Sequence, residues 1–257
     1  MNVTPTKAFP LQTKSTLTFA IGDIHGCFEE LRSLLDACRK AAGEIEHDFL
    51  FLGDYVDRGP ASDEVITCLM REQASAPSRF RCLLGNHDHM FCLAADRSRS
   101  DADLIQWWAN GGEETLDAYG IDDPSDLPAE HLAWMRALPL QVRDEHRLFV
   151  HAGVRPGVPL EAQSKDDMLW IREPFLSSRL WHGALIVHGH TPTETRAPDV
   201  QANRVNLDTG ACFGGPLTAA AFGSVQPGPL FFVNSDGLKF ELRSEPTRMR
   251  SPNSQVR

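Results

Sequence analysis

The chain has 257 residues, 42% of them hydrophobic and 23% charged, so its composition is that of a globular protein with a sizeable core. Its formal net charge of −10 argues against non-specific binding to nucleic acid or to an anionic membrane, since both need a basic surface. No window approaches the roughly 20 apolar residues of a membrane span, no secretory signal is recognised, and the six cysteines form no C-x-x-C pair, so we expect a cytoplasmic protein with reduced thiols.

The first half of the chain alternates short apolar runs with amphipathic stretches. Runs at 17–21, 49–52 and 80–84 predict strands, and each ends at Gly-Asp or Gly-Asn. Ser62 is placed to cap a helix after the second run. A helix with one buried face is predicted after the first run from the spacing of Cys27, Leu31, Leu34, Leu35 and Cys38. Strand, loop and helix follow each other three times, which predicts an α/β fold with parallel strands.

The segment from about 96 to 140 differs from what precedes it. A helical stretch over 101–119 is interrupted at Asn110-Gly111-Gly112, and a shorter helix is predicted over 132–138. We interpret this segment as a helical insertion beside the sheet.

The remainder of the chain predicts strands added to a sheet, without long helices. The predicted strands are 147–150, 184–187, 203–207, 217–223 and 229–233. A polar tail follows over 244–257, and no repeat or linker is present. We therefore expect a single domain with its core over about 17–243.

Five polar clusters each follow one of these apolar runs. They are Gly22-Asp23-Ile24-His25-Gly26, Gly53-Asp54-Tyr55-Val56-Asp57-Arg58-Gly59, Gly85-Asn86-His87-Asp88, His151-Ala152-Gly153 and His188-Gly189-His190-Thr191. Loops at the carboxyl ends of parallel strands converge on one crevice, so we expect the clusters to meet in space.

The chemistry of these clusters is that of a metal site. They offer carboxylate and amide oxygen with imidazole nitrogen and no thiolate, a donor set that suits manganese, iron or zinc better than calcium. A carboxylate such as Asp54 can bridge two cations, which would acidify a shared water molecule. Any one cluster alone is more simply a turn or a buried histidine, but their joint occurrence in this order favours the metal site.

The clusters GDIHG, GDYVDRG and GNHD, in this order, resemble the calcineurin-like metallophosphoesterases, and GDYVDRG resembles the phosphoprotein phosphatase branch. The resemblance runs from about residue 17 to 223 and is greatest to the compact bacterial and phage serine/threonine protein phosphatases. It implies a four-layer α/β/β/α sandwich with two central mixed sheets. The same subgroup is matched by Trp170-Ile171-Arg172-Glu173, Gly189-His190-Thr191-Pro192 and Asp208-Thr209-Gly210-Ala211.

The resemblance also implies a set of metal ligands. Asp23 and His25 would hold a first divalent cation, and Asp54 would bridge to a second. The second site would be completed by Asn86, His151 and His190. Manganese is the metal we expect, with iron or zinc as alternatives.

Four further residues receive catalytic roles from the resemblance. His87 would protonate the leaving oxygen, and Asp57 would orient it, since a carboxylate-paired imidazole is a suitable acid near neutral pH. Arg58 and Arg172 would bind the phosphoryl oxygens, which a planar guanidinium contacts in pairs. The implied reaction is in-line attack by a metal-bridging hydroxide, without a phosphoenzyme.

Other polar and aromatic residues in these motifs are open to more than one interpretation. His188 precedes Gly189-His190, whereas the usual second histidine follows, so a structural role is favoured over ligation. We assign Asp88 no chemistry. Trp107 and Trp108 either line a substrate entrance or pack on the sheet.

Three functions remain open. The first is a phosphatase acting on phosphoserine or phosphothreonine in proteins. The second is a nucleotide phosphohydrolase, such as a symmetric diadenosine tetraphosphatase, acting on a small phosphorylated substrate. The third is a pseudoenzyme that binds phosphoproteins or metals without turnover. The sequence shows neither a clear peptide groove nor a clear adenine-stacking signature.

Overall fold

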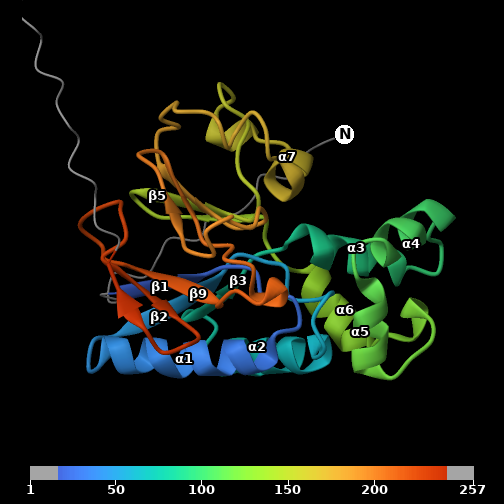
Figure 1. Ribbon diagram of the computed structural model, residues 1–257. Helices are drawn as coiled ribbons and strands as arrows, with labels where there is room; N and C mark the ends of the chain where they lie inside the picture. Colours follow the sequence, from blue (N-terminus) through green and yellow to red (C-terminus); the bar gives the residue numbers. More distant parts are fainter. Residues whose placement is uncertain (1–16, 242–257) are drawn as a thin grey trace, which may run out of the picture.

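Two mixed β-sheets stacked face to face form the centre of the computed structural model, which describes residues 17–241 (Figure 1). Helices cover the outer face of one sheet, so the expected α/β fold with two central mixed sheets is confirmed. The predicted polar tail over 244–257 lies outside the described residues.

The first sheet joins strands from both ends of the chain, in the order β11-β10-β9-β1-β2-β3. Strands β1, β2 and β3 are parallel because helical crossovers connect them, whereas β9, β10 and β11 run antiparallel to their neighbours. The strands are β1 (Leu17–Ile21), β2 (His47–Phe51), β3 (Phe80–Cys82), β9 (Thr218–Phe222), β10 (Phe231–Asn234) and β11 (Lys239–Phe240).

The second sheet has the order β4-β5-β6-β8-β7, with β5, β6 and β8 parallel. The strands are β4 (Gln141–Arg143), β5 (Arg147–Val150), β6 (Leu185–His188), β7 (Asp199–Val200) and β8 (Arg204–Asn206). The strands predicted in the second half of the chain are divided between the two sheets: β5, β6 and β8 build this second sheet, and β9 and β10 extend the first. Strands that are buried on both faces look alike in sequence, so the pattern alone does not identify the sheet that each one joins.

The core follows the two-residue period of the strands. Phe19 and Ile21 of β1 face the helices, whereas Ala20 between them faces the other sheet. Between the sheets, Phe149 of β5 contacts Phe222 of β9 edge to face, with ring centroids 5.8 Å apart. One apolar layer thus holds the sheets together and another holds the helices on the first sheet.

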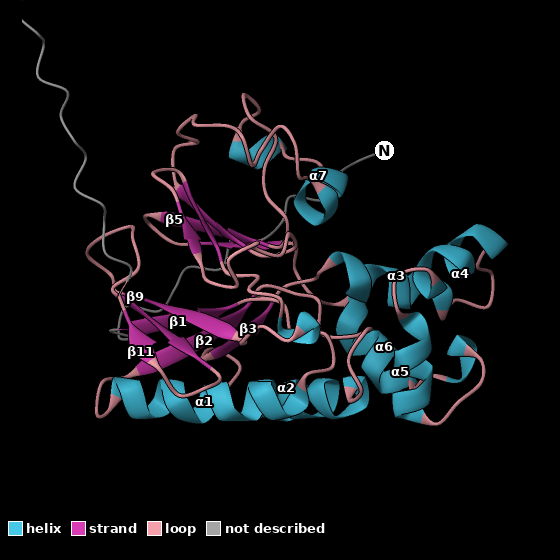
Figure 2. Cartoon of the chain, in the orientation of Figure 1, coloured by secondary structure: helices cyan, strands magenta, loops and turns pink. Residues whose placement is uncertain are grey.

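Helices α1 (Phe28–Ala42) and α2 (Ser62–Ser75) lie along the outer face of the first sheet (Figures 1 and 2). The predicted buried face of α1 is confirmed, since Leu31, Leu34, Leu35 and Cys38 are all buried. The prediction that Ser62 caps α2 is wrong, because Ala61 is the N-cap residue and Ser62 is already helical. The Ser62 hydroxyl instead accepts a hydrogen bond from the backbone of Asp57 at 3.2 Å.

A group of short helices lies beside the first sheet and packs against α2 (Figure 2). The break predicted at Asn110-Gly111-Gly112 is confirmed, and the helix predicted over 132–138 begins and ends earlier. The helix expected after the third apolar run is α3, and its bounds were not predicted because the GNHD cluster, in which it begins, resembles a turn. The elements are α3 (Asn86–Ala94), α4 (Asp101–Trp108), α5 (Gly112–Tyr119), the 3-10 turn η1 (Pro124–Asp126) and α6 (Ala129–Arg136).

The outer face of the second sheet has a thinner cover than the first. It consists of loops, the 3-10 turn η2 (Leu160–Ala162) and α7 (Lys165–Trp170), and Phe175 is fully buried in the apolar layer there. A further 3-10 turn, η3 (Ala211–Phe213), precedes β9. Over residues 17–241, no helix has the length and apolar character needed to cross a membrane.

Candidate metal centre

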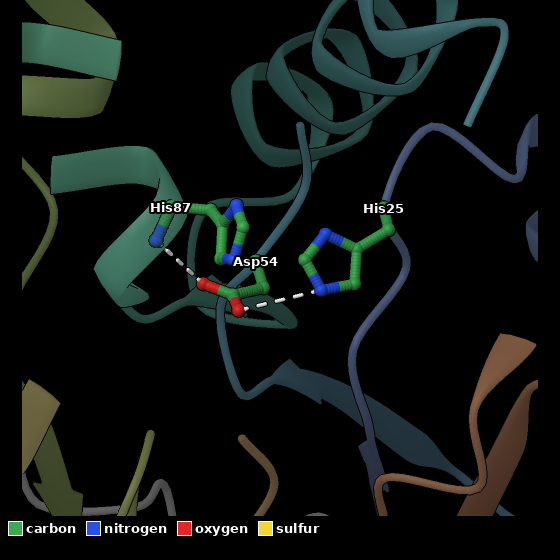
Figure 3. Close-up of side chains that lie close together, drawn as sticks. All are labelled: His25, Asp54 and His87. Carbon is green, nitrogen blue, oxygen red and sulfur yellow. Dashed lines mark hydrogen bonds and ion pairs between the residues drawn. The ribbon is translucent and has the colours of Figure 1, made fainter. Parts of the chain in front are cut away.

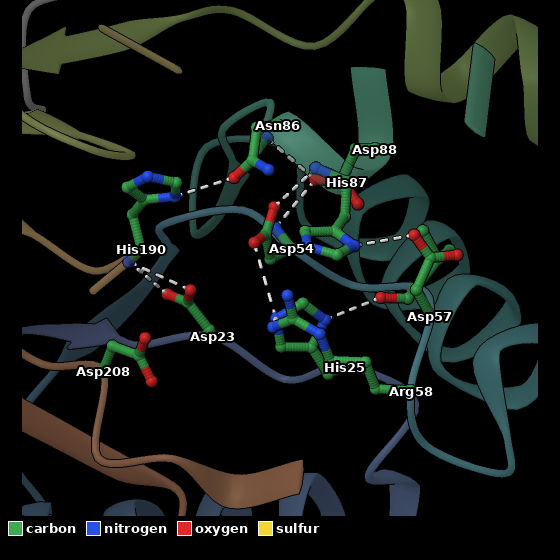
Figure 4. Close-up of polar contacts among 12 residues, drawn as sticks. Asp23, His25, Asp54, Asp57, Arg58, Asn86, His87, Asp88, His190 and Asp208 are labelled. Carbon is green, nitrogen blue, oxygen red and sulfur yellow. Dashed lines mark hydrogen bonds and ion pairs between the residues drawn. The ribbon is translucent and has the colours of Figure 1, made fainter. Parts of the chain in front are cut away.

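The five polar clusters meet at one edge of the two sheets, where strands of both sheets end. Figure 4 labels residues from the clusters that follow β1, β2, β3 and β6. The first three follow β1, β2 and β3 of one sheet, and the other two follow β5 and β6 of the second. The buried side chains brought to this edge are Asp23, His25, Asp54, Asp57, Asn86, His87, His151 and His190.

Asp54, His151 and His190 form one group of potential metal ligands, with donor atoms within 4.8 Å of one another. Asn86 joins them, because its Oδ1 lies 2.8 Å from His151 Nε2 and 2.8 Å from His190 Nδ1. Burial lowers the pKa of His151, and it lowers that of His190 to about 2, so both rings stay neutral.

The tautomer of His151 leaves a lone pair on Nε2 without a hydrogen-bond donor. Its Nδ1 lies 2.9 Å from the carbonyl oxygen of Leu52, which can only accept, so Nδ1 carries the hydrogen and Nε2 has a free lone pair. That lone pair faces the amide oxygen of Asn86, which is also an acceptor. A cation between the two atoms would satisfy both, and ligand sets of this kind suit transition metals.

A second group comprises His25, Asp54 and His87 (Figure 3). His25 Nδ1 donates to the carbonyl oxygen of Val56 at 2.8 Å, which leaves the Nε2 lone pair 3.5 Å from Asp54 Oδ2. Burial lowers the pKa of His25 to about 3, so this imidazole is also neutral. Arg58 Nη1 donates to the same Nε2 at 2.9 Å.

Asp23 lies between these groups and Asp208 rather than inside either group (Figure 4). Its carboxylate accepts the backbone N–H of His190 at 2.9 Å. Burial, followed by the charges of Asp208 and Asp54, raises the pKa of Asp23 well above its usual range. Burial also raises the pKa of Asp208 to about 7, and sequence reasoning gave this residue no role. An edge with this many buried carboxyls lacks positive charge, which divalent cations would supply.

His87 and Asp57 form a buried pair, with His87 Nδ1 2.7 Å from Asp57 Oδ2. Burial lowers the pKa of His87, but the charge of Asp54 and the hydrogen bond to Asp57 outweigh it, so the net shift is upward. His87 lies in the first turn of α3, where a backbone N–H has no partner within the helix. Its N–H donates instead to Asp54 Oδ1 at 2.9 Å. The imidazole is therefore held close to the ligand groups, with its pKa shifted upward.

The backbone of the site is strained. Of the six non-glycine residues with positive φ between 17 and 241, five are predicted site residues: His25, Asp54, Asp57, Arg58 and His190. Such conformations cost about 1–3 kcal/mol each and persist only where the surroundings impose them.

Asp88 is one of the residues that impose this backbone on the Asp54 loop. Its carboxylate accepts the backbone N–H groups of Asp54, Tyr55 and Gly85 at 2.8, 2.9 and 2.8 Å. Gly85 allows the close approach, because a Cβ at that position would lie 2.1 Å from Asp54 Oδ1. Asp88, which we assigned no chemistry, thus positions the candidate ligand without touching a cation site.

The two predicted phosphate-binding arginines border the site. The Arg58 guanidinium lies over the ring of Phe213, 5.4 Å from its centroid. Arg172 is exposed and lines a pocket of about 480 Å³ together with Trp170 and His190.

His188, Trp107 and Trp108 lie outside both ligand groups. His188 is buried against Phe175, with ring centroids 5.0 Å apart, and belongs to neither ligand group. Trp107 is fully buried and its indole N–H donates to Asp57 Oδ1, whereas Trp108 is 47% exposed. Trp107 is therefore a packing residue that also contacts the site through Asp57, a contact that the sequence did not predict.

Comparison with known proteins places this geometry in context. Residues 17–221 match the family described as calcineurin-like phosphoesterase. A serine/threonine-protein phosphatase 1 of Salmonella typhimurium is 35% identical over 219 residues, which cover 79% of this chain and 90% of that protein. A symmetrical bis(5'-nucleosyl)-tetraphosphatase of a Janthinobacterium species is 33% identical over 140 residues, which cover 54% of this chain but only 44% of the relative.

One solved structure, provisionally named a diadenosine tetraphosphatase, superimposes with a TM-score of 0.63. The superposition covers 89% of this chain and 97% of that one at 21% identity. A likeness at this level of identity supports the fold.

Proposed function

Because the chain belongs to the calcineurin-like phosphoesterase family, we propose that it hydrolyses phosphoserine and phosphothreonine esters in proteins. We choose a protein substrate over a nucleotide because the similarity to a protein phosphatase covers more of the chain. Similarity to the serine/threonine-protein phosphatase extends over 219 residues, whereas similarity to the Janthinobacterium tetraphosphatase extends over 140. A phosphatase of the metallophosphoesterase type is the broader statement on which the finer proposal rests.

The residues at the site fit a pair of divalent cations. Asp23 and His25 would hold one cation, Asp54 would lie between both, and Asn86, His151 and His190 would hold the other. The free lone pair of His151 supports this assignment, and the mixed oxygen and nitrogen donors favour manganese, with iron or zinc as alternatives. When bound, the cations supply acidity to a water molecule and neutralise charge on the phosphoryl group.

The remaining residues bind the phosphoryl group and move a proton. Arg58 and Arg172 would hold two phosphoryl oxygens each, which fixes the phosphorus for in-line attack by water. The bond from water oxygen to phosphorus forms as the ester P–O bond breaks. His87, paired with Asp57, would donate its proton to the departing serine or threonine oxygen.

The test compares kcat/KM for a phosphothreonine peptide and for diadenosine tetraphosphate, using the full chain reconstituted with manganese. We expect the peptide to be the better substrate, and the Asp54→Asn variant serves as the control for contaminating phosphatases. Faster hydrolysis of the tetraphosphate would replace the protein substrate with a nucleotide.

The nucleotide alternative has its own support in the tetraphosphatase relatives. The non-catalytic alternative does not explain why both ligand groups and both arginines are present around one edge. Release of phosphate from p-nitrophenyl phosphate that stops on chelation would exclude it.

A further inference from the structure

Helices α4 and α5 bring a buried tryptophan to the candidate acid pair. Trp107, at the end of α4, is fully buried beside Phe91, with ring centroids 6.3 Å apart. Its indole N–H, the only polar group of the side chain, donates to Asp57 Oδ1 at 2.9 Å. A buried indole N–H needs an acceptor, and here the acceptor is the carboxylate of the candidate acid pair, fifty residues away in the chain.

Thr115 of α5 makes two reciprocal hydrogen bonds with the same aspartate. Its hydroxyl donates to Asp57 Oδ1 at 2.8 Å and accepts the backbone N–H of Asp57 at 2.9 Å. Asp57 Oδ1 therefore has two donors on one side, and Oδ2 is left to face His87 Nδ1 at 2.7 Å. Because a carboxylate with one oxygen held in this way cannot rotate freely, the His87 ring receives a fixed partner.

The turn between α4 and α5 fixes the placement of Trp107. Gly112 lies against its indole, and a Cβ at that position would come within 2.5 Å of the ring. The same turn contacts the next site residue, because the backbone N–H of Arg58 donates to the carbonyl oxygen of Gly111 at 3.0 Å. The segment therefore contacts both Asp57 and Arg58.

We propose that Trp107 and Thr115 are positioning residues, which hold Asp57 so that His87 can deliver its proton to the leaving oxygen. This inference rests on the proposed phosphatase function. Trp107 and Thr115 both hydrogen-bond to Asp57, and we infer that they act through it.

The test uses Trp107→Phe, which keeps an aromatic ring and removes the indole N–H. Trp134→Phe is the matched control, because the Trp134 indole N–H also donates to a side chain, Gln73 Oε1 at 2.7 Å, away from the site. Each variant is measured on a phosphoserine peptide, whose leaving oxygen needs a proton, and on p-nitrophenyl phosphate, whose leaving group departs as an anion.

For Trp107→Phe we expect kcat on the peptide to fall about tenfold with KM unchanged, as for loss of one hydrogen bond to a charged group. The kcat on p-nitrophenyl phosphate should fall less than about twofold, since that reaction does not use the proton. Trp134→Phe should leave both rates unchanged.

Thr115 provides a second test that does not depend on the folding of Trp107→Phe. Thr115→Val should show the same selective loss on the peptide, and Thr115→Ser, which restores the hydroxyl, should recover the rate. Equal slowing of both esters, or failure of serine to restore the rate, would overturn the positioning role.

The rates of the wild-type protein on the two esters show whether the proposed function or only the positioning role fails. If it hydrolyses neither ester, the proposed function fails and the inference falls with it. If it hydrolyses both and the variants show no preference for either ester, only the positioning role fails.

Discussion

Replacing Asp54 with asparagine converts one oxygen of the shared ligand into an NH₂ group. Asp54 Oδ1 accepts the backbone N–H of His87 at 2.9 Å, so the new amide should keep its oxygen there. Its NH₂ would then take the place of Oδ2, which lies 3.5 Å from His25 Nε2. A donor at that position would join Arg58 Nη1, which already lies 2.9 Å from His25 Nε2, in competing with a cation for that lone pair.

The magnitude follows from what the substitution removes. The variant loses one negative charge that both ligand groups share, and it blocks a ligand atom of one of them. A loss of about 4 kcal/mol of transition-state stabilisation corresponds to a decrease in kcat of about 10³-fold. The fold should survive, because the amide has the shape of the carboxylate and retains the hydrogen bond from His87.

The assay measures kcat on p-nitrophenyl phosphate at saturating manganese, together with metal content by mass spectrometry and a thermal melt. Asp117→Asn, on the exposed side of α5, makes the same chemical change away from the site and should behave as wild type. A folded Asp54→Asn protein with wild-type kcat would refute a shared carboxylate ligand.

Three further predictions concern the acid, the arginine and the metal. His87→Ala should lower kcat on phosphopeptides by about 10²-fold or more and on aryl phosphates much less, with His89→Ala as the neighbouring control; equal slowing would remove His87 from the acid role. Arg172→Lys should lower kcat/KM about tenfold, because an ammonium cannot contact two phosphoryl oxygens in one plane, and an unchanged value in steady-state assays would show that Arg172 does not bind phosphate. Metal analysis after manganese reconstitution should find two ions per chain and a rise in melting temperature, whereas a single tight zinc would contradict the paired site.

Local patterns predicted the elements that bury one regular face. The spacing of Leu31, Leu34, Leu35 and Cys38 identified α1, and the apolar run at 17–21 identified β1, because periodicity depends only on neighbouring residues. The start of helix α3 escaped prediction because it depends on Asp54 and Asp88 rather than on an apolar stripe. The prediction that Ser62 is an N-cap failed for a similar reason. Its hydroxyl accepts a hydrogen bond from the Asp57 loop, which the local pattern does not indicate.

The sequence by itself determined which donor atoms are available and that each follows a strand. The tertiary structure decided which of those atoms face a cation. The carbonyl oxygen of Leu52, 99 residues from His151, sets its tautomer, and Trp107, fifty residues from Asp57, holds the carboxylate of the acid pair. These contacts depend on how two sheets and a group of helices pack together, and no local pattern of residues encodes that packing.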